Sequence, residues 1–495
     1  MALLSLGLHL LPHPGYDFHR DELFYLAMGE HLSLFRMGFP PLIALLAQLA
    51  RALPLDLLTA IRLLPALAGA MLTVLAALIA QAMGGSRQAQ LVAAVATLAA
   101  PLFLRAATLF QPVVFEQVWW AIAVLAITHL LAGRSRRWWL ALGLALGLGA
   151  LTKFSVAFLG VGVLAAVLAS PLRRDLRTRW PWLALGIATV LALPSLLGQV
   201  TWGWPFFAQM RALREHQLGH FSRVDFVTGQ FLLLGPGGPL WLIGMAALFF
   251  AASLRVFRPL GVLALTVFLL LLLSGGKEYY YGPMLPALIA AASTLFGAWL
   301  LRGRRTAFLV GVLVLLLVGG GALLPIGIPL LPPEKLARYS AAVGVTQATR
   351  TNYGTTLPLP QDFADMTGWP EQVESVAEVF HALSPADQAQ AVILGNNYGR
   401  TAAIALYGPK LGLPYPVSRH GDFYFWGTGG KTGEVTIVVG GSVEALRAYW
   451  SEVTEAGRSS NPWGVDEEQS VPIFVCRRPK EDLQAVFHKL GPYWG

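Results

Sequence analysis

The chain has 495 residues, of which 55% are hydrophobic and only 13% are charged, and its mean hydropathy is +0.58. Because soluble proteins carry about 25% charged residues, this composition excludes an ordinary soluble protein and indicates a helical protein that crosses a membrane several times. The net charge of +9 does not indicate nucleic-acid binding, because the arginines gather in short loops between apolar runs. The one cysteine, Cys476, excludes an intramolecular disulfide and a cysteine-cluster metal site.

The first stretch, Met1 to Leu11, is apolar but shorter than the ~20 residues that a membrane-spanning helix needs. It has neither the positive charge nor the cleavage site of a signal peptide. We therefore interpret it as the outer half of a first helix whose beginning lies outside this chain.

A charged stretch, Gly15 to Ala27, follows within a long first loop over residues 12–60. Its adjacent acids, Asp21 and Glu22, cannot both lie on an apolar face. Because charge at the edge of a bilayer is costly, it normally lines a wet cavity or a functional site. Further along the same loop, paired prolines break the chain and an amphipathic interfacial helix is expected over 42–53.

Ten apolar runs follow, so we expect about ten or eleven transmembrane helices in a domain that covers residues 1–330. Arginines occupy alternate loops between the runs, and by the positive-inside rule those loops are cytoplasmic. The runs cover residues 61–83, 90–106, 113–132, 138–151, 154–170, 180–200, 229–252, 260–274, 283–301 and 306–325. The arginines are Arg87, Arg134, Arg136, Arg137, Arg173, Arg174, Arg177, Arg179, Arg255, Arg258, Arg302, Arg304 and Arg305.

The segment from 138 to 170 allows two interpretations, one long helix or two short helices that meet at Lys153. One long helix would overshoot the bilayer and move the arginines at 173–179 to the other side. We predict two helices with Lys153 at an outer turn. The remaining outer segments are then 12–60, 107–112, 201–228, 274–282 and everything after about residue 326.

Beyond residue 331 the hydropathy falls and short elements alternate, which predicts a compact α/β domain over 331–495 on the extracytoplasmic side. A turn at Gly395 to Gly399 joins an expected strand to an expected helix. It could hold a sugar or an anion, but an ordinary loop is favoured, and we expect no catalytic residue after 326. The expected helices are 369–383, 400–411, 442–450 and 483–490, and the expected strands are 391–394, 422–426, 434–439 and 471–475.

Four clusters of ionisable residues that lie at or within apolar runs all map to the outer face of this topology. Each of them alone has a purely structural explanation, such as a carboxylate at a helix end among the lipid headgroups or a lysine that reaches the interface. Together they suit a reaction in which a carboxylate takes the proton of an attacking hydroxyl and cations stabilise a leaving phosphate. The residues are Asp21, Glu22, Glu116, Lys153, Lys277 and Glu278.

Several short segments resemble bacterial membrane glycosyltransferases of family 39. This group of the GT-C architecture includes protein O-mannosyltransferases and lipid A aminoarabinose transferases. Its first-loop signature is similar to Tyr16, Arg20 to Leu26 and Pro40-Pro41-Leu42. Later segments that resemble the family, in order, are Phe110 to Gln117, Leu151 to Ser155, Gly203 to Phe206 and Gly276 to Tyr280.

The resemblance implies a role for each matching residue. Asp21 would be the general base on the acceptor hydroxyl, and Glu22 would support it or hold the acceptor. Glu116 would be the second acid, which orients the acceptor or, together with Asp21, a divalent metal if one is used. The sugar-donor phosphate would be bound by Lys153, Lys277 and Arg20, with Tyr279 and Tyr280 beside it.

The resemblance also implies the reaction and its place. The chain would lie in a bacterial inner (plasma) membrane, surrounded by membrane lipids, with its active site on the extracytoplasmic side. It would move a sugar from a polyprenyl-phosphate carrier to a lipid, glycan or protein acceptor, with inversion because one base suffices for direct displacement. The alternatives are a transporter or flippase for a lipid-linked or anionic substrate and, more weakly, an inactive scaffold. A transporter should show related halves or broken helices near mid-membrane, and the sequence shows neither.

Overall fold

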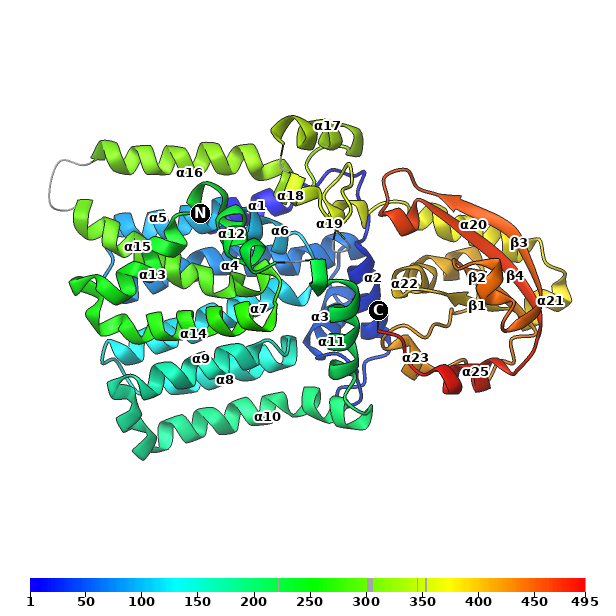
Figure 1. Ribbon diagram of the computed structural model, residues 1–495, viewed down its shortest axis with the longest axis horizontal. Helices are drawn as coiled ribbons and strands as arrows, with labels where there is room; N and C mark the ends of the chain where they lie inside the picture. The colour runs from blue at the N-terminus through cyan, green and yellow to red at the C-terminus, as the bar shows by residue number, and fades with distance from the viewer. Residues whose placement is uncertain (221, 301–305, 345, 352–353, 495) are drawn as a thin grey trace.

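The computed structural model describes residues 1–220, 222–300, 306–344, 346–351 and 354–494. A bundle of roughly parallel helices forms one part of the molecule, and a smaller unit built on a β-sheet caps one end of it (Figure 1). The first loop and helices α2, α3 and α11 lie between the two parts.

Up to residue 351, the described residues form eighteen α-helices, some of them short, of which the last two follow residue 331 and lie beside the bundle (Figure 1). They are α1 (Ala2–His9), α2 (Arg20–Glu30), α3 (Leu42–Arg51), α4 (Leu57–Ala82), α5 (Arg87–Ala99), α6 (Pro101–Ala106), α7 (Pro112–Leu131), α8 (Trp138–Thr152), α9 (Val156–Leu168), α10 (Arg179–Thr201), α11 (Pro205–His216), α12 (Arg223–Leu234), α13 (Leu240–Phe250), α14 (Arg258–Ser274), α15 (Leu285–Leu300), α16 (Thr306–Gly327), α17 (Pro333–Val343) and α18 (Thr346–Thr349). The interfacial helix expected over 42–53 is therefore present as α3.

Five helices among the described residues are long and apolar enough to cross a membrane, or seven if each of two bent pairs is one span. This number is smaller than that of the predicted apolar runs, because several runs form helices too short to pass the length test. The five are Leu57–Ala82, Pro112–Leu131, Arg179–Thr201, Ala252–Ser274 and Thr306–Gly327.

Two predicted runs are interrupted, because proline or glycine residues break the helix. The run over 90–106 is divided into α5 and α6, and Pro101 opens the second helix. The run over 229–252 is bent by 102° between α12 and α13. The break contains Pro236 and Pro239 among glycines, which cannot continue an α-helix without strain.

The prediction of two helices on either side of Lys153 is confirmed. Helix α8 ends at Thr152 and α9 begins at Val156. Lys153 itself has extended backbone angles, with φ of −163° and ψ of 137°.

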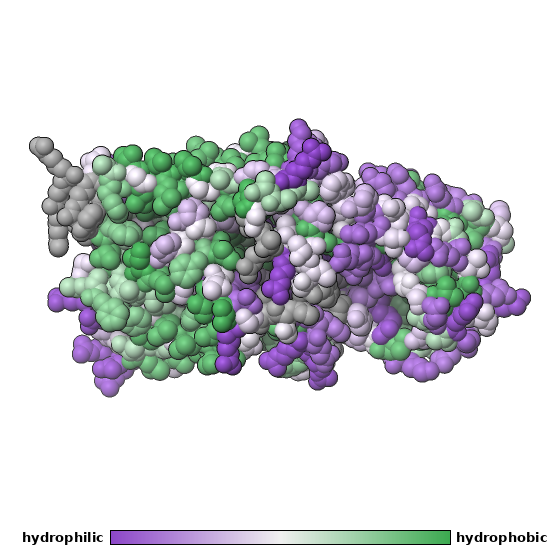
Figure 2. All heavy atoms as spheres, turned by 45° about the horizontal axis from the view of Figure 1, so that its top comes forward, coloured by the Kyte–Doolittle hydropathy of each residue, from purple (hydrophilic) through white to green (hydrophobic). Residues whose placement is uncertain are grey.

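The outer surface of the helical part is strongly apolar, as Figure 2 shows in green. Large side chains point outwards from α10 and α16, among them Leu185, Val190 and Val318, which are 56–67% exposed. Such a surface is stable only against lipid. The described arginine-bearing turns lie at the end of the bundle away from the sheet unit (Figure 1), whereas Arg302, Arg304 and Arg305 fall outside the described residues.

The sheet unit has four strands in the order β1-β2-β4-β3, with β1 parallel to β2 and the other pairs antiparallel. The strands are β1 (Val392–Gly395), β2 (Val435–Val439), β3 (Trp450–Ser460) and β4 (Ser470–Pro479). The helices of this part are α19 (Gln361–Ala364), α20 (Trp369–His381), α21 (Pro385–Gln390), α22 (Tyr398–Tyr407), α23 (Phe423–Trp426), α24 (Val443–Leu446) and α25 (Leu483–Leu490).

Two predictions for the sheet unit are wrong. The segment 422–426 is not a strand but the short helix α23, which packs its aromatic rings against the first loop. Phe423 lies 5.9 Å from Phe24, and Phe425 stacks on Trp202 at 4.1 Å between ring centroids. The second error is strand β3, which was not predicted apart from Trp450, the last residue of the helix expected over 442–450. That helix is present in shortened form as α24, with Ser442 as its N-cap.

The sheet unit is seated directly on the helical part. Helix α22 lies against α2, and the same hydrophobic core runs through both. Phe24 of α2 contacts Tyr398 of α22 at 5.4 Å, and Phe39 of the first loop contacts Trp494 at 5.5 Å. A continuous apolar contact of this kind fixes the sheet unit over the end of the bundle.

Candidate active site

Helix α2 begins at the charged stretch because its N-terminus is capped by side chains. His19 Nδ1 accepts a hydrogen bond from Asp21 N at 3.1 Å, and Glu22 Oε2 accepts from His19 N at 2.8 Å. This reciprocal capping box satisfies two main-chain N–H groups and places acids in the first turn, where the helix dipole favours them. The two adjacent acids then point to different surroundings.

Glu22 is completely buried and serves the architecture. Its second oxygen, Oε1, accepts a hydrogen bond from Phe110 N at 2.9 Å, and Arg62 Nη2 lies 3.8 Å from Oε2. Glu22 therefore ties α2 to the loop before α7. This loop carries Gln111, whose side chain reaches Asp21.

Asp21 is half-buried and lines a large cavity. Gln111 Nε2 donates a hydrogen bond to Asp21 Oδ2 at 2.8 Å, and the Tyr398 hydroxyl donates to Oδ1 at 2.7 Å. Each carboxylate oxygen is thus held by one donor, and each oxygen keeps lone-pair capacity for a further proton donor. The two hydrogen bonds orient the carboxylate, and it can still accept a further hydrogen bond.

Lys153 and Glu116 form an ion pair at the turn between α8 and α9. Lys153 Nζ lies 3.1 Å from Glu116 Oε2, and the Ser155 hydroxyl donates to Oε1. The ammonium also lies 5.4 Å and 5.0 Å from the ring centroids of Tyr279 and Tyr280, within cation–π range. Glu116 is buried, so it fixes the lysine from within the bundle.

Lys277 lies in the loop after α14, where its side chain is only 5% exposed. Its Nζ donates a hydrogen bond to Gln217 Oε1 at 2.8 Å. Burial lowers the pKa of Lys277 to about 8, against the opposing effect of Glu278. An anion bound beside this ammonium group would favour its charged form.

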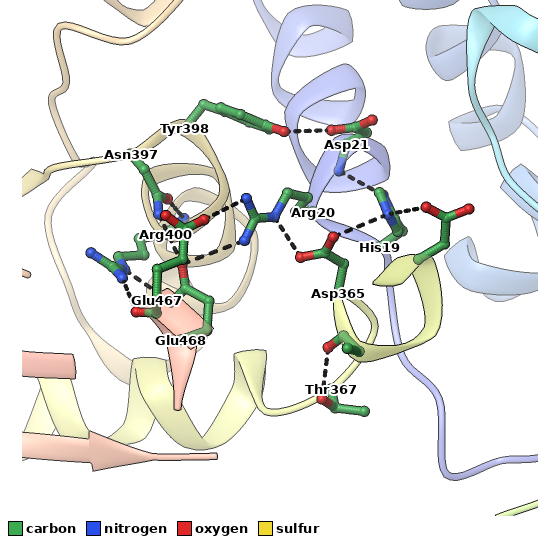
Figure 3. A network of polar contacts seen from close by, with 12 residues as sticks. His19, Arg20, Asp21, Asp365, Thr367, Asn397, Tyr398, Arg400, Glu467 and Glu468 are labelled. Atoms are coloured by element: carbon green, nitrogen blue, oxygen red, sulfur yellow. Dashed lines mark hydrogen bonds and ion pairs between the residues drawn. The ribbon is translucent and has the colours of Figure 1, made fainter. Parts of the chain in front are cut away.

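Arg20 faces the sheet unit and is surrounded by carboxylates (Figure 3). Its guanidinium nitrogens lie 2.7 Å from Asp365 Oδ1, 2.7 Å from Glu467 Oε1 and 3.7 Å from Glu468 Oε1. Glu468 in turn pairs with Arg400 at 2.9 Å. The charge of Arg20 is therefore directed to the junction between the two parts of the molecule.

One cavity of about 1890 Å³ brings most of the predicted residues together at the sheet-unit end of the bundle. Its apolar lining includes Phe154, Phe206 and Phe207, beside the charged groups. Of the predicted site residues, it is lined by Arg20, Asp21, Lys153, Lys277, Tyr279 and Tyr280. Glu22 and Glu116 are buried and are not among the described residues that line it.

The described residues contain no group of three or more histidine, cysteine, aspartate or glutamate side chains that could hold a metal ion. Glu116 already has Lys153 and Ser155 as partners. Asp21 has Gln111 and Tyr398. The pair proposed as metal ligands is thus engaged by protein donors.

Two polar residues of the site were not predicted from the sequence. Gln111 stands in a segment that was singled out, yet an amide in a loop gave no reason to assign it a role. Tyr398 lies within the turn at 395–399, for which an ordinary loop was favoured. The expectation of no catalytic residue after 326 overlooked that this turn brings a hydroxyl into contact with Asp21.

Comparison with known proteins gives a partial match to one family model and a likeness of fold. The family model of dolichyl-phosphate-mannose-protein mannosyltransferases matches residues 39–197. The apo structure of ArnT from Cupriavidus metallidurans aligns with a TM-score of 0.61 at 18% identity, over 96% of each chain. The structure of the same protein bound to undecaprenyl phosphate aligns with a TM-score of 0.58 at 16% identity, again over 96% of each chain.

A sequence search among curated proteins gives no match. The likeness to ArnT is one of fold, and it extends over both the helical part and the sheet unit, since nearly the whole of each chain is aligned.

Proposed function

We propose that this chain is a membrane glycosyltransferase that uses a polyprenyl-phosphate sugar, on the premise of its match to the mannosyltransferase family model over residues 39–197 and of the fold that it shares with ArnT. The predicted fold class is confirmed by this shared fold, and the family match supports the predicted resemblance. The proposal on the sugar donor is supported by the ArnT structure, which was solved with undecaprenyl phosphate bound. The acceptor would be a lipid, glycan or protein hydroxyl.

The observation that carries the proposal is the shared cavity of Asp21, Lys153 and Lys277. The two ammonium groups are suited to the phosphate of the sugar donor, with Tyr279 and Tyr280 holding Lys153 in place. The aromatic lining beside them is suited to the first units of the prenyl chain. The sugar would then lie between the lysines and Asp21.

The chemistry that we propose is a direct displacement. Asp21 takes the proton of the acceptor hydroxyl while that oxygen forms a bond to the anomeric carbon. The bond from the anomeric carbon to the phosphate oxygen breaks, and the phosphate leaves with its charge stabilised by the lysines. Because attack and departure occur on opposite faces of the sugar, the anomeric configuration is inverted.

The other predicted residues would act on this centre indirectly. Glu116 would hold Lys153, and Glu22 would hold the loop that carries Gln111. Arg20, with three carboxylates around it, would fasten the sheet unit over the cavity. We propose the same division of the chain as the sequence indicated, with a transferase domain over 1–330 and an α/β domain over 331–495.

We further place the cavity and the α/β domain on the extracytoplasmic side of a bacterial inner membrane. The described arginine-bearing turns lie at the opposite end of the bundle (Figure 1), which would be cytoplasmic by the positive-inside rule. An acceptor hydroxyl would then approach from the side of the α/β domain. A transporter or flippase is less well supported, because the ionisable groups gather at one end of the bundle rather than along a path through it.

The test uses the purified full chain in detergent with a prenyl-phosphate sugar, and it measures release of prenyl phosphate. Asp21→Asn and Lys153→Ala should each reduce release by about a hundredfold or more, the size typical of a lost general base or a lost charge stabiliser. Asp17→Asn is the matched control, because Asp17 lies in the same loop but is not among the described cavity residues. Full activity in both site variants would reject the proposed site, and movement of intact lipid without release of phosphate would favour the transporter.

A further inference from the structure

We infer that the α/β domain supplies a working part of the active site, namely Tyr398, whose hydroxyl holds the carboxylate of Asp21 in the orientation needed to take the acceptor proton. The inference rests on the proposed function, because it gives a role to a group that touches the proposed base. Tyr398 is thus a positioning residue that acts through Asp21.

Tyr398 is fixed from three sides at the start of α22. Its helix is capped by Asn397, whose side-chain oxygen accepts from Arg400 N at 2.8 Å. Its ring packs on Phe24 of α2 at 5.4 Å, and the guanidinium of Arg20 lies 6.0 Å from its centroid. The hydroxyl therefore reaches Asp21 from a ring that has little freedom to turn.

The two hydrogen bonds on Asp21 come from the two different parts of the molecule. Gln111, from the bundle, holds Oδ2, and Tyr398, from the α/β domain, holds Oδ1 (Figure 3 shows the second). Together they fix both the rotation and the tilt of the carboxylate. Without Tyr398 the carboxylate keeps only Gln111 and can rotate about its χ2 bond, for which the preference is weak.

The Tyr398 hydroxyl remains a donor throughout the range of an assay. Burial, and after it the negative charge of Asp21, raise the pKa of Tyr398 well above its ordinary value. A neutral hydroxyl beside a carboxylate forms a charge-assisted hydrogen bond, which favours the charged form of the carboxylate. Loss of this bond should therefore leave the carboxylate of the base less firmly oriented.

The chain offers a closely matched control in Tyr407, at the other end of the same helix. Its hydroxyl donates to Asp17 Oδ2 at 2.7 Å, so it also joins α22 to an aspartate of the first loop. Neither Tyr407 nor Asp17 is among the described residues that line the cavity. Tyr398→Phe and Tyr407→Phe thus each remove one hydrogen bond between the same two parts, but only the first bond touches the proposed base.

The experiment follows release of prenyl phosphate by the full chain across pH 4 to 8, together with thermal unfolding. Tyr398→Phe should lower kcat by about tenfold, the effect of one lost hydrogen bond to a charged group. The KM for the sugar donor should hardly change, because the Tyr398 hydroxyl is held on Asp21. Tyr407→Phe should leave both kcat and KM unchanged, although both variants should lower Tm by a similar small amount.

The outcomes separate this inference from the proposed function. If Asp21→Asn keeps activity, the proposed base is wrong. If Asp21→Asn is inactive but Tyr398→Phe has the kcat of the original protein, the inference alone is wrong. Equal losses in Tyr398→Phe and Tyr407→Phe would also overturn it, because they would reflect a general loosening of the junction. In the Asp21→Asn background, Tyr398→Phe should have no further effect on the residual rate.

Discussion

Lys277 is a cation whose charge should depend on pH within the range of an ordinary assay. Its burial lowers its pKa to about 8, so the side chain is charged below that pH and neutral above it. If it binds the phosphate of the sugar donor, affinity should fall as pH rises from 7 to 9. Competition by a prenyl phosphate against the sugar donor measures this affinity at each pH.

Two substitutions make the pH test specific to that residue. Lys277→Arg keeps a cation at all these pH values, so the loss of affinity between pH 7 and 9 should largely disappear. Lys277→Met removes the charge and should bind prenyl phosphate weakly at every pH. Affinity that is constant from pH 7 to 9 and unchanged by Lys277→Met would exclude Lys277 from the phosphate site.

Glu22 should be needed for stability rather than for proton transfer. Its two oxygens accept from His19 N and Phe110 N, whereas glutamine offers one acceptor and one N–H₂ group. Glu22→Gln would therefore leave one buried main-chain N–H facing another donor, at a cost of about 1–3 kcal/mol. Thermal unfolding in detergent should show a clear decrease in Tm.

Glu30→Gln is the comparison for this prediction, because Glu30 ends the same helix and pairs with Arg51 in a half-exposed position. Exposed ion pairs are worth little, so its Tm should hardly change. Equal Tm values for the two variants would show that the buried hydrogen bonds of Glu22 do not stabilise the first loop.

Charged site residues could be predicted from the sequence, while their neutral partners could not. Asp21, Lys153 and Lys277 stand out because charge among apolar residues is costly and needs a reason. A glutamine or a tyrosine at the end of a loop has no such cost. Gln111 and Tyr398 therefore become visible only when the fold brings them to Asp21.

At the scale of elements, α10 has an apolar outer face, yet its last turn holds the first loop in place. Gln199 Nε2 donates to Gly38 O at 2.6 Å, and Gln199 Oε1 accepts from Phe206 N at 2.8 Å. A methyl group on Gly198 would lie 2.3 Å from Met37 O. The helix can approach the loop this closely only because residue 198 is glycine.

Gly198→Ala should therefore push α10 away from the first loop and lower both Tm and transfer activity. Gly186→Ala is the control on the same helix, since a methyl group there would meet no atom within 4 Å. It should leave activity unchanged and should not lower Tm, because alanine favours helix over glycine by about 1 kcal/mol. If the two variants behave alike, the contact between Gly198 and Met37 is not a constraint on the site.

Elements were predictable where their residues are buried in a regular pattern. Strand β2 has an unbroken buried run, Val435–Val439, and was predicted almost to the residue. Strand β3 is an edge strand whose middle is exposed and charged, with Glu452, Glu455 and Arg458, so it has no apolar alternation to detect. The aromatic run at 423–426 suggested a strand, but packing on the first loop favours a helix there.

At the scale of the whole molecule, the first loop is the surface on which the α/β domain is seated. The polar side of this junction is the set of carboxylates around Arg20, and the apolar side is built on Phe24 and Phe39. Asp422 lies on the apolar side, where it is 2% exposed and accepts from Gly38 N through Oδ1 at 2.8 Å. Its Oδ2 has no hydrogen-bond partner among the described residues.

Asp422 should make this junction sensitive to pH in a direction that can be worked out. Burial raises the pKa of Asp422 to about 7, only partly offset by the Gly38 hydrogen bond, whereas an unfolded aspartate titrates near 4. Between these values the folded protein holds a proton that the unfolded chain has released. Stability from this group is therefore greatest at low pH and is lost as pH rises from about 4 through 7.

Asp422→Asn should remove that dependence, because the amide oxygen can still accept from Gly38 N and the side chain never ionises. At pH 8 the variant should unfold at a temperature about 2–4 °C higher than the original protein, since it no longer buries a charge. At pH 5, where the folded Asp422 is still neutral and only the unfolded chain has lost the proton, the gain should be much smaller than at pH 8. Thermal unfolding at both pH values decides the matter, because a gain that is equal at pH 5 and 8, or absent at pH 8, would mean that Asp422 is not a buried acid that titrates at the junction.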